Sequence, residues 1–458
     1  MRISFTKALF FLSEAFWIFS AVIAGAFIRF GFSPEATVEY AEVIPKALLV
    51  VAVFQLCLYY FDLYDFNLVA DRQELSIRLL QGIGAATLVL AVVYYLLPGA
   101  IIGRGIFVIS LGLLILTLFT WRLLCNWLLQ ARGFREPILV LGAGEMAKGI
   151  VREVIVRKDS GYQVIGFIDD DPASLGVSLV NPRVIANSGQ MFRVAQEHGV
   201  RRIVVAQTDR RGKLPIEALL DCRLHGIRVE EGASFYERLT GKIPVEELRP
   251  SWLIFSEGFV RSRLALFLKA IIDFTASLAL LILLAPLLLA VALLIKLDSR
   301  GPVFFQQARV GQGGKVFTLY KFRSMQEDAE AQGRPVWAQK DDPRVTRVGR
   351  LIRKTRIDEI PQVFSVLTGE MSFVGPRPER PFFVEQLRQQ IPYYNQRHVM
   401  KPGITGWAQI NYHYGSSVDD AIEKLRYDLY YIKHVTPLLD LFIIFQTVKV
   451  VLFGEGAW

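Results

Sequence analysis

The sequence predicts a membrane protein of mixed α and α/β class. Its expected parts are a four-helix transmembrane bundle, a Rossmann-like α/β domain, a further apolar helix and a polar C-terminal region. Two observations carry this prediction. The 458-residue chain is 52% hydrophobic and only 21% charged, which is too apolar for an ordinary soluble protein. After the first apolar runs, a glycine-rich turn joins a strand-like segment to a helix-like one.

Residues 1–131 are predicted to form four transmembrane helices. Each apolar run is close to the ~20 residues that span a bilayer, and the runs lie at 8–29, 43–61, 79–98 and 105–129. Basic residues precede the first run, separate the second from the third and follow the fourth, so both ends of the bundle are expected in the cytoplasm. The first run lacks a clear small-residue cleavage site, which favours a retained helix over a signal peptide.

A Rossmann-like domain is predicted over 136–245, where strand-like and helix-like segments alternate. Its first strand enters a GxGxxA turn containing Gly142, Gly144 and Ala147, and its second strand ends at Asp169. Asp169 lies further along than the roughly 20 residues usual for a ribose-binding acid. Two interpretations therefore stay open: these residues bind a nucleotide, or the domain serves shape or regulation.

The segment 264–296 contains an uncharged run long enough to span a bilayer, with Pro286 near its middle. Proline removes one helical hydrogen bond and clashes with the preceding turn, so it can kink or break the helix. Basic residues flank both ends, and the positive-inside preference favours a cytoplasmic position for each. A kinked fifth transmembrane helix and a re-entrant helix that bends at Ala285 and Pro286 are both compatible with the sequence.

The region 297–458 contains residues suited to phosphate chemistry. Arginines recur at every third position from Arg344 to Arg356 and lead into the adjacent carboxylates Asp358 and Glu359. Most of these arginines are predicted to form a basic helix face toward anionic lipid or water. Adjacent carboxylates repel, but a dense positive field keeps acids ionised, which suits a nucleophile or a metal ligand.

Three nearby motifs add basic residues in restricted backbones. "KFRSM" follows a strand-like segment, "GPRPER" holds an arginine between prolines, and "KPGITG" holds a lysine in a Pro-Gly turn. Each motif alone is more typical of a structural loop, but a fixed cation can bind phosphate at low entropic cost. Phosphoryl transfer depends mainly on such charge neutralisation and alignment. The predicted phosphate-binding residues are Lys321, Arg323, Arg377 and Lys401.

From about Lys269 to its end, the sequence resembles the monotopic polyprenyl-phosphate sugar-1-phosphate transferases of the bacterial sugar transferase family. The motifs that carry the resemblance occur in family order: "KAIIDF", "YKFRSM", "RKTRIDEIPQ", "GEMSFVGPRP", "KPGITGWAQI" and "YDLYYIKH". Large members of this family also carry four transmembrane helices and a Rossmann-like domain before a mainly helical catalytic domain. The resemblance therefore covers essentially the whole chain.

The resemblance implies a reaction in which a UDP-sugar, by default glucose or galactose, donates sugar-1-phosphate to undecaprenyl phosphate. UMP leaves, and surface polysaccharide synthesis begins. Asp358 matches the nucleophile that forms a phosphosugar–enzyme intermediate, Glu359 the carboxylate that binds Mg²⁺, and Arg353 a phosphate contact. The resemblance also implies a re-entrant membrane helix, although many relatives have serine where this chain has Ala285 before Pro286.

The expected partners are a UDP-sugar, undecaprenyl phosphate and the lipid bilayer, with no nucleic acid. In a membrane protein, a formal charge of +9 favours anionic lipid and phosphate as partners. The resemblance implies the bacterial inner membrane, with the Rossmann-like and catalytic domains in the cytoplasm. The oligomeric state stays open, and a homodimer is one option.

Two other functions would account for parts of this sequence. A membrane nucleotide-sugar dehydratase shares the N-terminal plan but needs a Tyr-x-x-x-Lys pair, which this sequence lacks. A non-catalytic scaffold of polysaccharide assembly needs no intact acidic pair. The presence of Asp358, Glu359 and Arg353 together favours the enzyme over that scaffold.

Overall fold

The computed structural model describes residues 5–31, 36–64, 72–130, 135–157, 160–207, 214–248, 250–256, 258–259, 262–326, 342–412, 415 and 417–453. The chain divides into two compact units. The first comprises Met1–Leu141, Val151–Ile203 and Pro215–Val229, and the second comprises Gly142–Ile150, Val204–Leu214 and Glu230–Trp458. This division passes through the predicted Rossmann-like domain, so the domain limits at 131, 136–245, 264–296 and 297–458 stay predictions.

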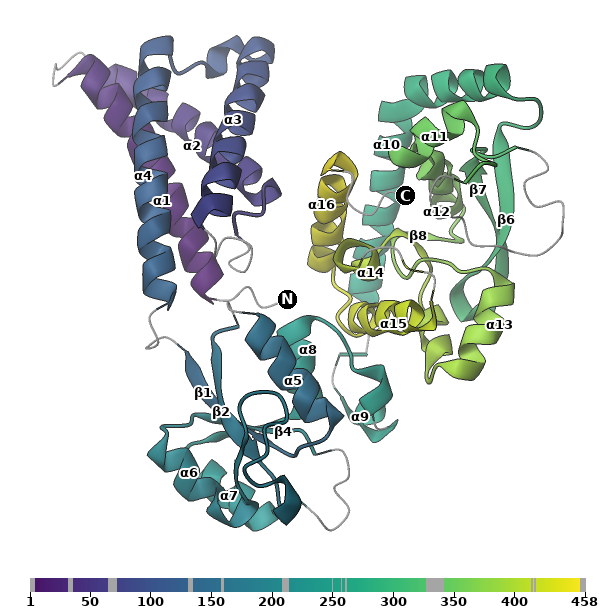
Figure 1. The fold of residues 1–458 in the computed structure, drawn as a ribbon. Coiled ribbons are helices and arrows are strands. Elements are labelled where there is room, and N and C mark those ends of the chain that lie inside the picture. Colours follow the sequence, from purple (N-terminus) through teal and green to yellow (C-terminus); the bar gives the residue numbers. More distant parts are fainter. Residues whose placement is uncertain are drawn as a thin grey trace. The chain divides into compact units, whose positions relative to one another are not determined.

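Each of the four N-terminal apolar runs forms one long helix, as predicted. The helices are α1 (Phe5–Phe30), α2 (Ala36–Tyr60), α3 (Arg72–Leu96) and α4 (Arg104–Gln130). Figure 1 shows them as an elongated group, and they share a core that includes the fully buried Ile18, Leu58 and Leu79. α3 begins at Arg72, before the predicted run at 79–98, so Arg72 and Arg78, two of the basic residues that separate the second and third runs in the sequence, lie inside the helix.

A buried ion pair joins α1 to α4. Arg122 Nε lies 2.7 Å from Glu14 Oε1, and the two side chains are 2% and 0% exposed. Arg122 also donates a hydrogen bond to the carbonyl of Leu63 in the connection that follows α2. Charges inside an apolar helix bundle are costly unless they are paired, so this contact stabilises one arrangement of the helices.

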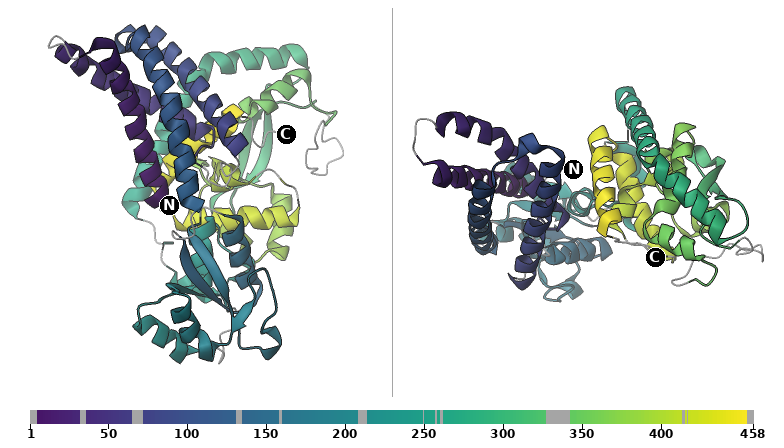
Figure 2. Two further views of the ribbon diagram at one scale, coloured as in Figure 1. Left: turned by 60° about the vertical axis from the view of Figure 1, so that its left-hand side comes forward. Right: turned by 90° about the horizontal axis from the view of Figure 1, so that it is seen from above.

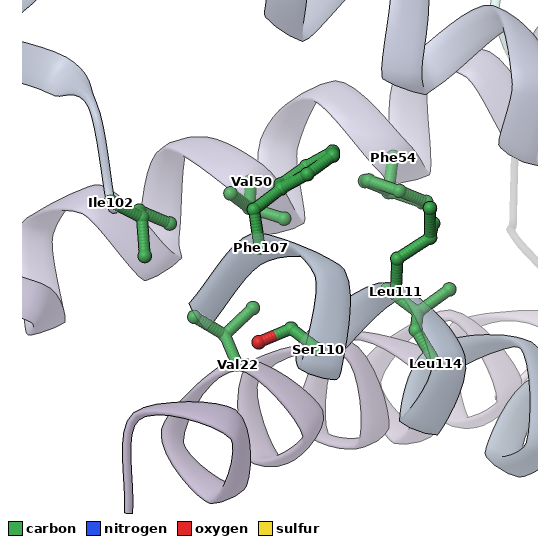
Figure 3. A pocket seen from close by; sticks show the side chains of 8 residues that line it. All are labelled: Val22, Val50, Phe54, Ile102, Phe107, Ser110, Leu111 and Leu114. Carbon is green, nitrogen blue, oxygen red and sulfur yellow. The ribbon is translucent and has the colours of Figure 1, made fainter. Parts of the chain in front are cut away.

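A small apolar cavity lies between α1, α2 and α4, as Figure 3 shows. Its volume is about 10 Å³, and Ser110 contributes the single hydroxyl among its lining side chains. That volume is close to the space that one water molecule requires. The cavity is therefore a packing gap and not a ligand site.

The Rossmann-like region contains a five-stranded sheet in the order β3-β2-β1-β4-β5. The strands are β1 (Glu136–Leu141), β2 (Tyr162–Ile168), β3 (Val184–Ala186), β4 (Arg202–Val205) and β5 (Arg228–Glu231). The helices are α5 (Glu145–Val156), α6 (Met191–Glu197), α7 (Ile216–Leu224) and α8 (Gly232–Thr240). β1 pairs in parallel with β2, and β2 with β3. The strand order reverses between β1 and β4, which is typical of a doubly wound sheet.

The rest of the chain is mainly helical, as predicted for the C-terminal region. Its helices are α9 (Pro250–Phe255), α10 (Arg263–Asp298), α11 (Arg347–Lys354), α12 (Val363–Leu367), α13 (Pro381–Gln390), α14 (Trp407–Asn411), α15 (Val418–Lys433) and α16 (Pro437–Phe453). The antiparallel pair is β6 (Phe304–Val310) with β7 (Val316–Phe322), and the parallel pair is β8 (Ser372–Val374) with β9 (Gly403–Thr405). Their largest core includes Val374, Leu425 and Leu429.

The long apolar helix α10 contains Pro286 and is bent, so that Figures 1 and 2 show two stretches of different direction. Before the bend, Lys269 Nζ donates to the carbonyl of Val374 at 2.9 Å. After the bend, Ile295 packs in a buried cluster with Ile352. Both ends of α10 are therefore attached to the same compact unit, although its length and composition alone would also suit a membrane span.

The last helix, α16, is apolar but is interrupted by Asp440, Gln446 and Lys449, a pattern that predicts an interfacial or packed helix rather than a span. Asp440, in its first turn, is completely buried and accepts a hydrogen bond from Lys269 Nζ at 2.9 Å. Among the described helices, five are long and apolar enough to cross a membrane, and α16 is not one of them. The packed interpretation is confirmed.

Candidate active site

The basic helix predicted from the arginine repeat is shorter than the repeat itself. α11 covers only its three middle members, because Arg344 lies before the helix and Arg356 after it. Arg344 instead forms an ion pair with Asp342, with 2.6 Å between Nη2 and Oδ2. Arg356 has a left-handed backbone with φ 58°, which non-glycine residues rarely adopt. The chain therefore turns at Arg356, immediately before the acidic pair.

Asp358 and Glu359 lie in the short 3₁₀ segment η8 (Ile357–Gln362) that follows this turn. The Asp358 residue is only 9% exposed. Pro361, in the same segment, is also buried, and its ring restricts the backbone next to the acidic pair. The pair is thus part of a packed turn and not a solvated helix surface.

Two of the predicted cations converge on Glu359. Lys321, near the end of β7, places Nζ 2.8 Å from Glu359 Oε1. Arg377, in the turn after β8, donates through Nη1 to Oε2 at 3.2 Å and through Nη2 to Oε1. The Glu359 side chain is 12% exposed, so this two-cation contact is largely shielded from water. Segments far apart in the sequence are brought together at one carboxylate.

The neighbouring carboxylates differ in acidity. Burial, reinforced by the charge of Glu359, raises the pKa of Asp358 to about 6. The charges of Lys321, Arg353 and Arg377 oppose that shift. Burial also acts to raise the pKa of Glu359, but Arg377 and Lys321 lower it well below its ordinary value. At neutral pH both groups are mainly ionised, and Asp358 is the one closer to its protonation point.

The positive charge of Arg353 also acts on Asp358. Arg353 lies in the last turn of α11, is half-buried, and favours the ionised form of Asp358. The helix C-terminus and the turn at Arg356 bring the end of α11 close to the acidic pair. The role predicted for Arg353 in phosphate binding stays a prediction.

The other two predicted phosphate ligands make different contacts. Arg323 is 5% exposed and donates to the carbonyl and hydroxyl oxygens of Ser299 at 2.9 and 2.8 Å, at the C-terminal end of α10. The ammonium of Lys401 lies 3.5 Å from where a Cβ on Gly369 would stand. In the part of the chain that the structure describes, neither cation forms an ion pair with Glu359. Their phosphate-binding roles stay predictions.

A buried polar network that the sequence did not predict holds α10 against the C-terminal region. Lys269 Nζ donates to Tyr431 Oη at 3.1 Å as well as to Asp440, and Tyr431 Oη donates to Asp440 Oδ1 at 2.6 Å. Asp273, one turn after Lys269, accepts from Phe373 N at 2.9 Å. In the sequence Lys269 resembled a membrane-flanking charge. The acidic residue Asp440 within the apolar α16 is the sequence feature that indicates a buried cationic partner.

The GxGxxA turn has the predicted strand–turn–helix context. Gly142 follows β1 with φ 107°, and a Cβ there would lie 3.2 Å from the backbone of Gln207, so glycine is required. Gly144 accepts the first hydrogen bond of α5, and Ala147 is completely buried. Asp169 follows β2 and is half-buried. These positions confirm the local fold, and nucleotide binding by them stays a prediction.

A metal ion was expected at Glu359. Among the described residues, no group of three or more His, Cys, Asp or Glu side chains forms a closed metal site. The acidic pair nevertheless fits Mg²⁺ chemistry, because Mg²⁺ is usually bound by one or two carboxylates that substrate phosphates and water supplement. Glu359 would have to exchange at least one of its cation contacts for the ion.

The chain matches two family models. Residues 264–454 match the model described as bacterial sugar transferase, and residues 59–212 match the model described as CoA-binding domain.

Several known bacterial proteins are similar to the chain. It is 45% identical to UDP-N-acetylgalactosamine-undecaprenyl-phosphate N-acetylgalactosaminephosphotransferase of Aeromonas hydrophila, over 52% of this chain and 56% of that protein. It is 34% identical to undecaprenyl-phosphate glucose phosphotransferase of Komagataeibacter xylinus, over 72% and 61%. It is also 34% identical to UDP-glucose:undecaprenyl-phosphate glucose-1-phosphate transferase of Escherichia coli (strain K12), over 71% and 70%. The chain thus spans less than two thirds of the first two relatives.

Proposed function

Because the chain belongs to the bacterial sugar transferase family, we propose that it transfers sugar-1-phosphate from a UDP-sugar to undecaprenyl phosphate. The observation that carries this proposal is the buried acidic pair with cations converging on it. Lys321 and Arg377 both contact Glu359, which leaves Asp358 beside a positive cluster. Such a cluster suits a diphosphate, since phosphoryl transfer relies on neutralising and aligning charged oxygens.

The proposed reaction has two displacements at the same phosphorus atom. In the first, a carboxylate oxygen of Asp358 attacks the phosphorus that carries the sugar, the bond to the UMP oxygen breaks, and UMP leaves with the electron pair. In the second, a phosphate oxygen of undecaprenyl phosphate attacks that phosphorus and the bond to Asp358 breaks. The lipid then carries a diphosphate-linked sugar, and the free carboxylate returns. A covalent carboxyl phosphate divides one difficult step into two.

The cations have complementary tasks in this scheme. In the absence of substrate, Lys321 and Arg377 neutralise Glu359. When the donor binds, we expect Lys321 and Arg377 to share their hydrogen bonds with the diphosphate oxygens. Arg353 would add a third positive charge near Asp358.

Arg323 and Lys401 are weaker candidates for phosphate contact, since their contacts in the structure lie elsewhere.

Magnesium would be held by Glu359, with substrate phosphates and water as further ligands. When bound, the ion would neutralise charge on the diphosphate oxygens. The protein side chains would still orient the donor, because Arg377 is fixed between two prolines and Lys321 projects from a strand.

The re-entrant interpretation of α10 follows from its attachments. Lys269 and Ile295 both pack within one compact unit, which supports a course in which the two ends of the helix emerge on one side of the bilayer. From Phe274 to Pro286 a helix rises by roughly 18 Å, just over half of the ~30 Å hydrocarbon core. Pro286 therefore lies at a depth suitable for a return. We propose that this helix brings the site to the cytoplasmic face of the bacterial inner membrane, where the lipid acceptor resides.

The donor sugar is proposed only as a class. The default expectation is UDP-glucose or UDP-galactose, while the relatives' names give glucose and N-acetylgalactosamine. A panel of these three UDP-sugars, scored by UMP release with undecaprenyl phosphate and Mg²⁺, identifies the donor. Any of the three is compatible with the proposed chemistry, because the reacting atoms are the same.

The test of the mechanism is Asp358→Asn in the purified full-length chain. With UDP-sugar labelled at the sugar-linked phosphate, the wild-type protein should become labelled and release UMP, and the variant should do neither. We expect UMP release to fall by at least ~10³-fold, because the amide cannot act as the nucleophile. The matched control is Asp419→Asn, an exposed acid in the first turn of α15. UMP release at the wild-type rate in Asp358→Asn would refute Asp358 as the nucleophile, whereas a wild-type protein that neither becomes labelled nor releases UMP would favour the scaffold.

A further inference from the structure

The turn that carries Arg377 is held at four successive backbone carbonyls. Residues 376–379 each accept a hydrogen bond from a different part of the chain. The donors, in order, are Gly403 N at 2.9 Å, Arg397 Nη2 at 3.0 Å, Arg309 Nη1 at 2.8 Å and Val310 N at 2.9 Å. The carbonyl of Arg377 itself is therefore bound by a side chain, not by a regular strand partner.

Arg397 is buried and engaged on several sides. It is 5% exposed, and Asp428 and Tyr394 around it are 1% and 2% exposed. Its Nε and Nη2 donate to Asp428 Oδ2 at 3.1 and 2.8 Å, and its Nη1 donates to Tyr394 Oη at 2.7 Å. Nη2 thus donates both to the acid and to the Arg377 carbonyl. Only a planar guanidinium offers donors in this fixed arrangement.

Arg397 is connected to the acidic pair through Arg377, because it binds the Arg377 carbonyl and the Arg377 side chain contacts Glu359. Pro376 and Pro378 restrict the backbone on both sides of Arg377, so a shift of its carbonyl also moves the guanidinium that contacts Glu359. Burying an arginine and an acid is costly, and apolar packing would fill the same space more cheaply. A buried ion pair that orients a functional residue has a reason to be retained.

We propose that Arg397, held by Asp428, is a positioning residue that fixes Arg377 against Glu359 and the donor diphosphate. This inference rests on the proposed function, since it gives Arg377 a substrate to orient. Neither Arg397 nor Asp428 contacts Glu359 through any of these bonds. Their effect passes through the Arg377 backbone, and this route distinguishes positioning from a general contribution to stability.

The principal variant is Arg397→Lys in the full-length chain. Lysine keeps the positive charge near Asp428 but has no planar fork, so it cannot reproduce all the hydrogen bonds. We expect kcat/KM for the UDP-sugar to fall by about 10- to 100-fold, the effect of misplacing a binding group by about 1 Å. If this variant is too unstable to purify, Tyr394→Phe removes only the hydroxyl partner of Arg397 and should give a smaller loss.

A double-mutant cycle with Arg377→Ala separates positioning from stability. If Arg397 acts through Arg377, then Arg397→Lys should cause no further loss in the Arg377→Ala background. The matched control is Glu237→Gln, which disrupts a comparably buried ion pair with Lys433, 2.8 Å apart, without a bond to the Arg377 turn. That control should lower the melting temperature while leaving kcat/KM unchanged in both backgrounds.

Several results would overturn the inference. One is an equal loss from Arg397→Lys with and without Arg377. Another is unchanged kcat/KM in both Arg397→Lys and Tyr394→Phe, and a third is full activity in Arg377→Ala. Asp358→Asn, measured alongside, tests the proposed function by itself. An inactive Asp358→Asn combined with additive effects of Arg397 and Arg377 would leave the transferase mechanism standing and remove only the positioning role.

Discussion

Lys269 and Asp440 form a buried ion pair, with 2.9 Å between Nζ and Oδ2, that joins the start of the bent helix α10 to α16. The two side chains are 7% and 1% exposed. Tyr431 Oη contacts both groups, so the pair belongs to a closed polar network. This network attaches the start of α10 to α15 and α16.

Removing one partner of this pair should be strongly destabilising. Lys269→Met leaves the acid of Asp440 buried without its cation, which costs about 3–5 kcal/mol in comparable sites. The melting temperature of the purified protein should fall by several degrees. Replacing both partners, in Lys269→Met with Asp440→Leu, should restore part of the loss. The exposed Lys296 near the other end of α10 supplies the control, since Lys296→Met should have little effect. Equal melting temperatures for Lys269→Met and wild type would contradict the expectation.

The course of α10 through the bilayer can be tested by cysteine labelling. Leu264 and Leu297, which are 65% and 75% exposed near its two ends, are replaced singly by cysteine after removal of the native thiols. In inverted membrane vesicles, a membrane-impermeant maleimide should label both positions, because a re-entrant helix returns to the cytoplasmic face. Intact spheroplasts should show labelling of neither. Labelling from opposite faces would establish a spanning helix instead.

Chelation should remove activity but not stability. With EDTA we expect UMP release to stop and to return when Mg²⁺ is added, because the ion would neutralise the donor diphosphate. The melting temperature should not change, since the described residues include no closed group of metal ligands that could support the fold. Glu359→Gln should raise the Mg²⁺ concentration needed for half-maximal activity. Undiminished activity in EDTA would exclude the metal role.

Acid should destabilise the protein through His398. Burial, with the charge of Arg397, lowers the pKa of His398 to about 4 from the ordinary value of about 6.5. The unfolded chain therefore binds this proton more readily. The stability contributed by neutral His398 is fully present above pH 6.5 and is lost as the pH falls toward 4.

The corresponding measurement is the melting temperature between pH 7 and pH 4. His398→Gln should lose less stability over this range than the wild type, because it has no half-buried imidazole to protonate. His225, which is exposed on α7's C-terminal end, supplies the control substitution His225→Gln. Identical pH dependence in His398→Gln and wild type would show that another group titrates in this window.

Local sequence patterns determined much of this protein. The apolar runs correspond to α1–α4 because hydrophobic length is a property of neighbouring residues. The strand before Lys321 and the strand–turn–helix at Gly142 also depend on local signals, and both were found. The acidic pair and the resemblance to a transferase family required only the printed residues.

Tertiary structure decided which cations reach the acidic pair. Lys321 and Arg323 are two residues apart, and side-chain alternation would place both on one face of a strand. β7 ends at Phe322, however, so Arg323 leaves that pattern and contacts Ser299 instead. Only the fold brings Arg377 to Glu359.

The same distinction applies to the membrane helix. Pro286 indicated a break in α10, but the local residues left a span and a return equally open, and only the family resemblance favoured the return. In the fold, Lys269 and Ile295 are both attached to one compact unit, and this attachment supports the proposed return. The physical reason is that helix and strand formation depends on adjacent residues, whereas burial and charge pairing depend on contacts between residues far apart in the chain. Lys269 illustrates this difference. Its position in the sequence indicates a charge that flanks an apolar run, whereas in the fold it is buried and pairs with Asp440.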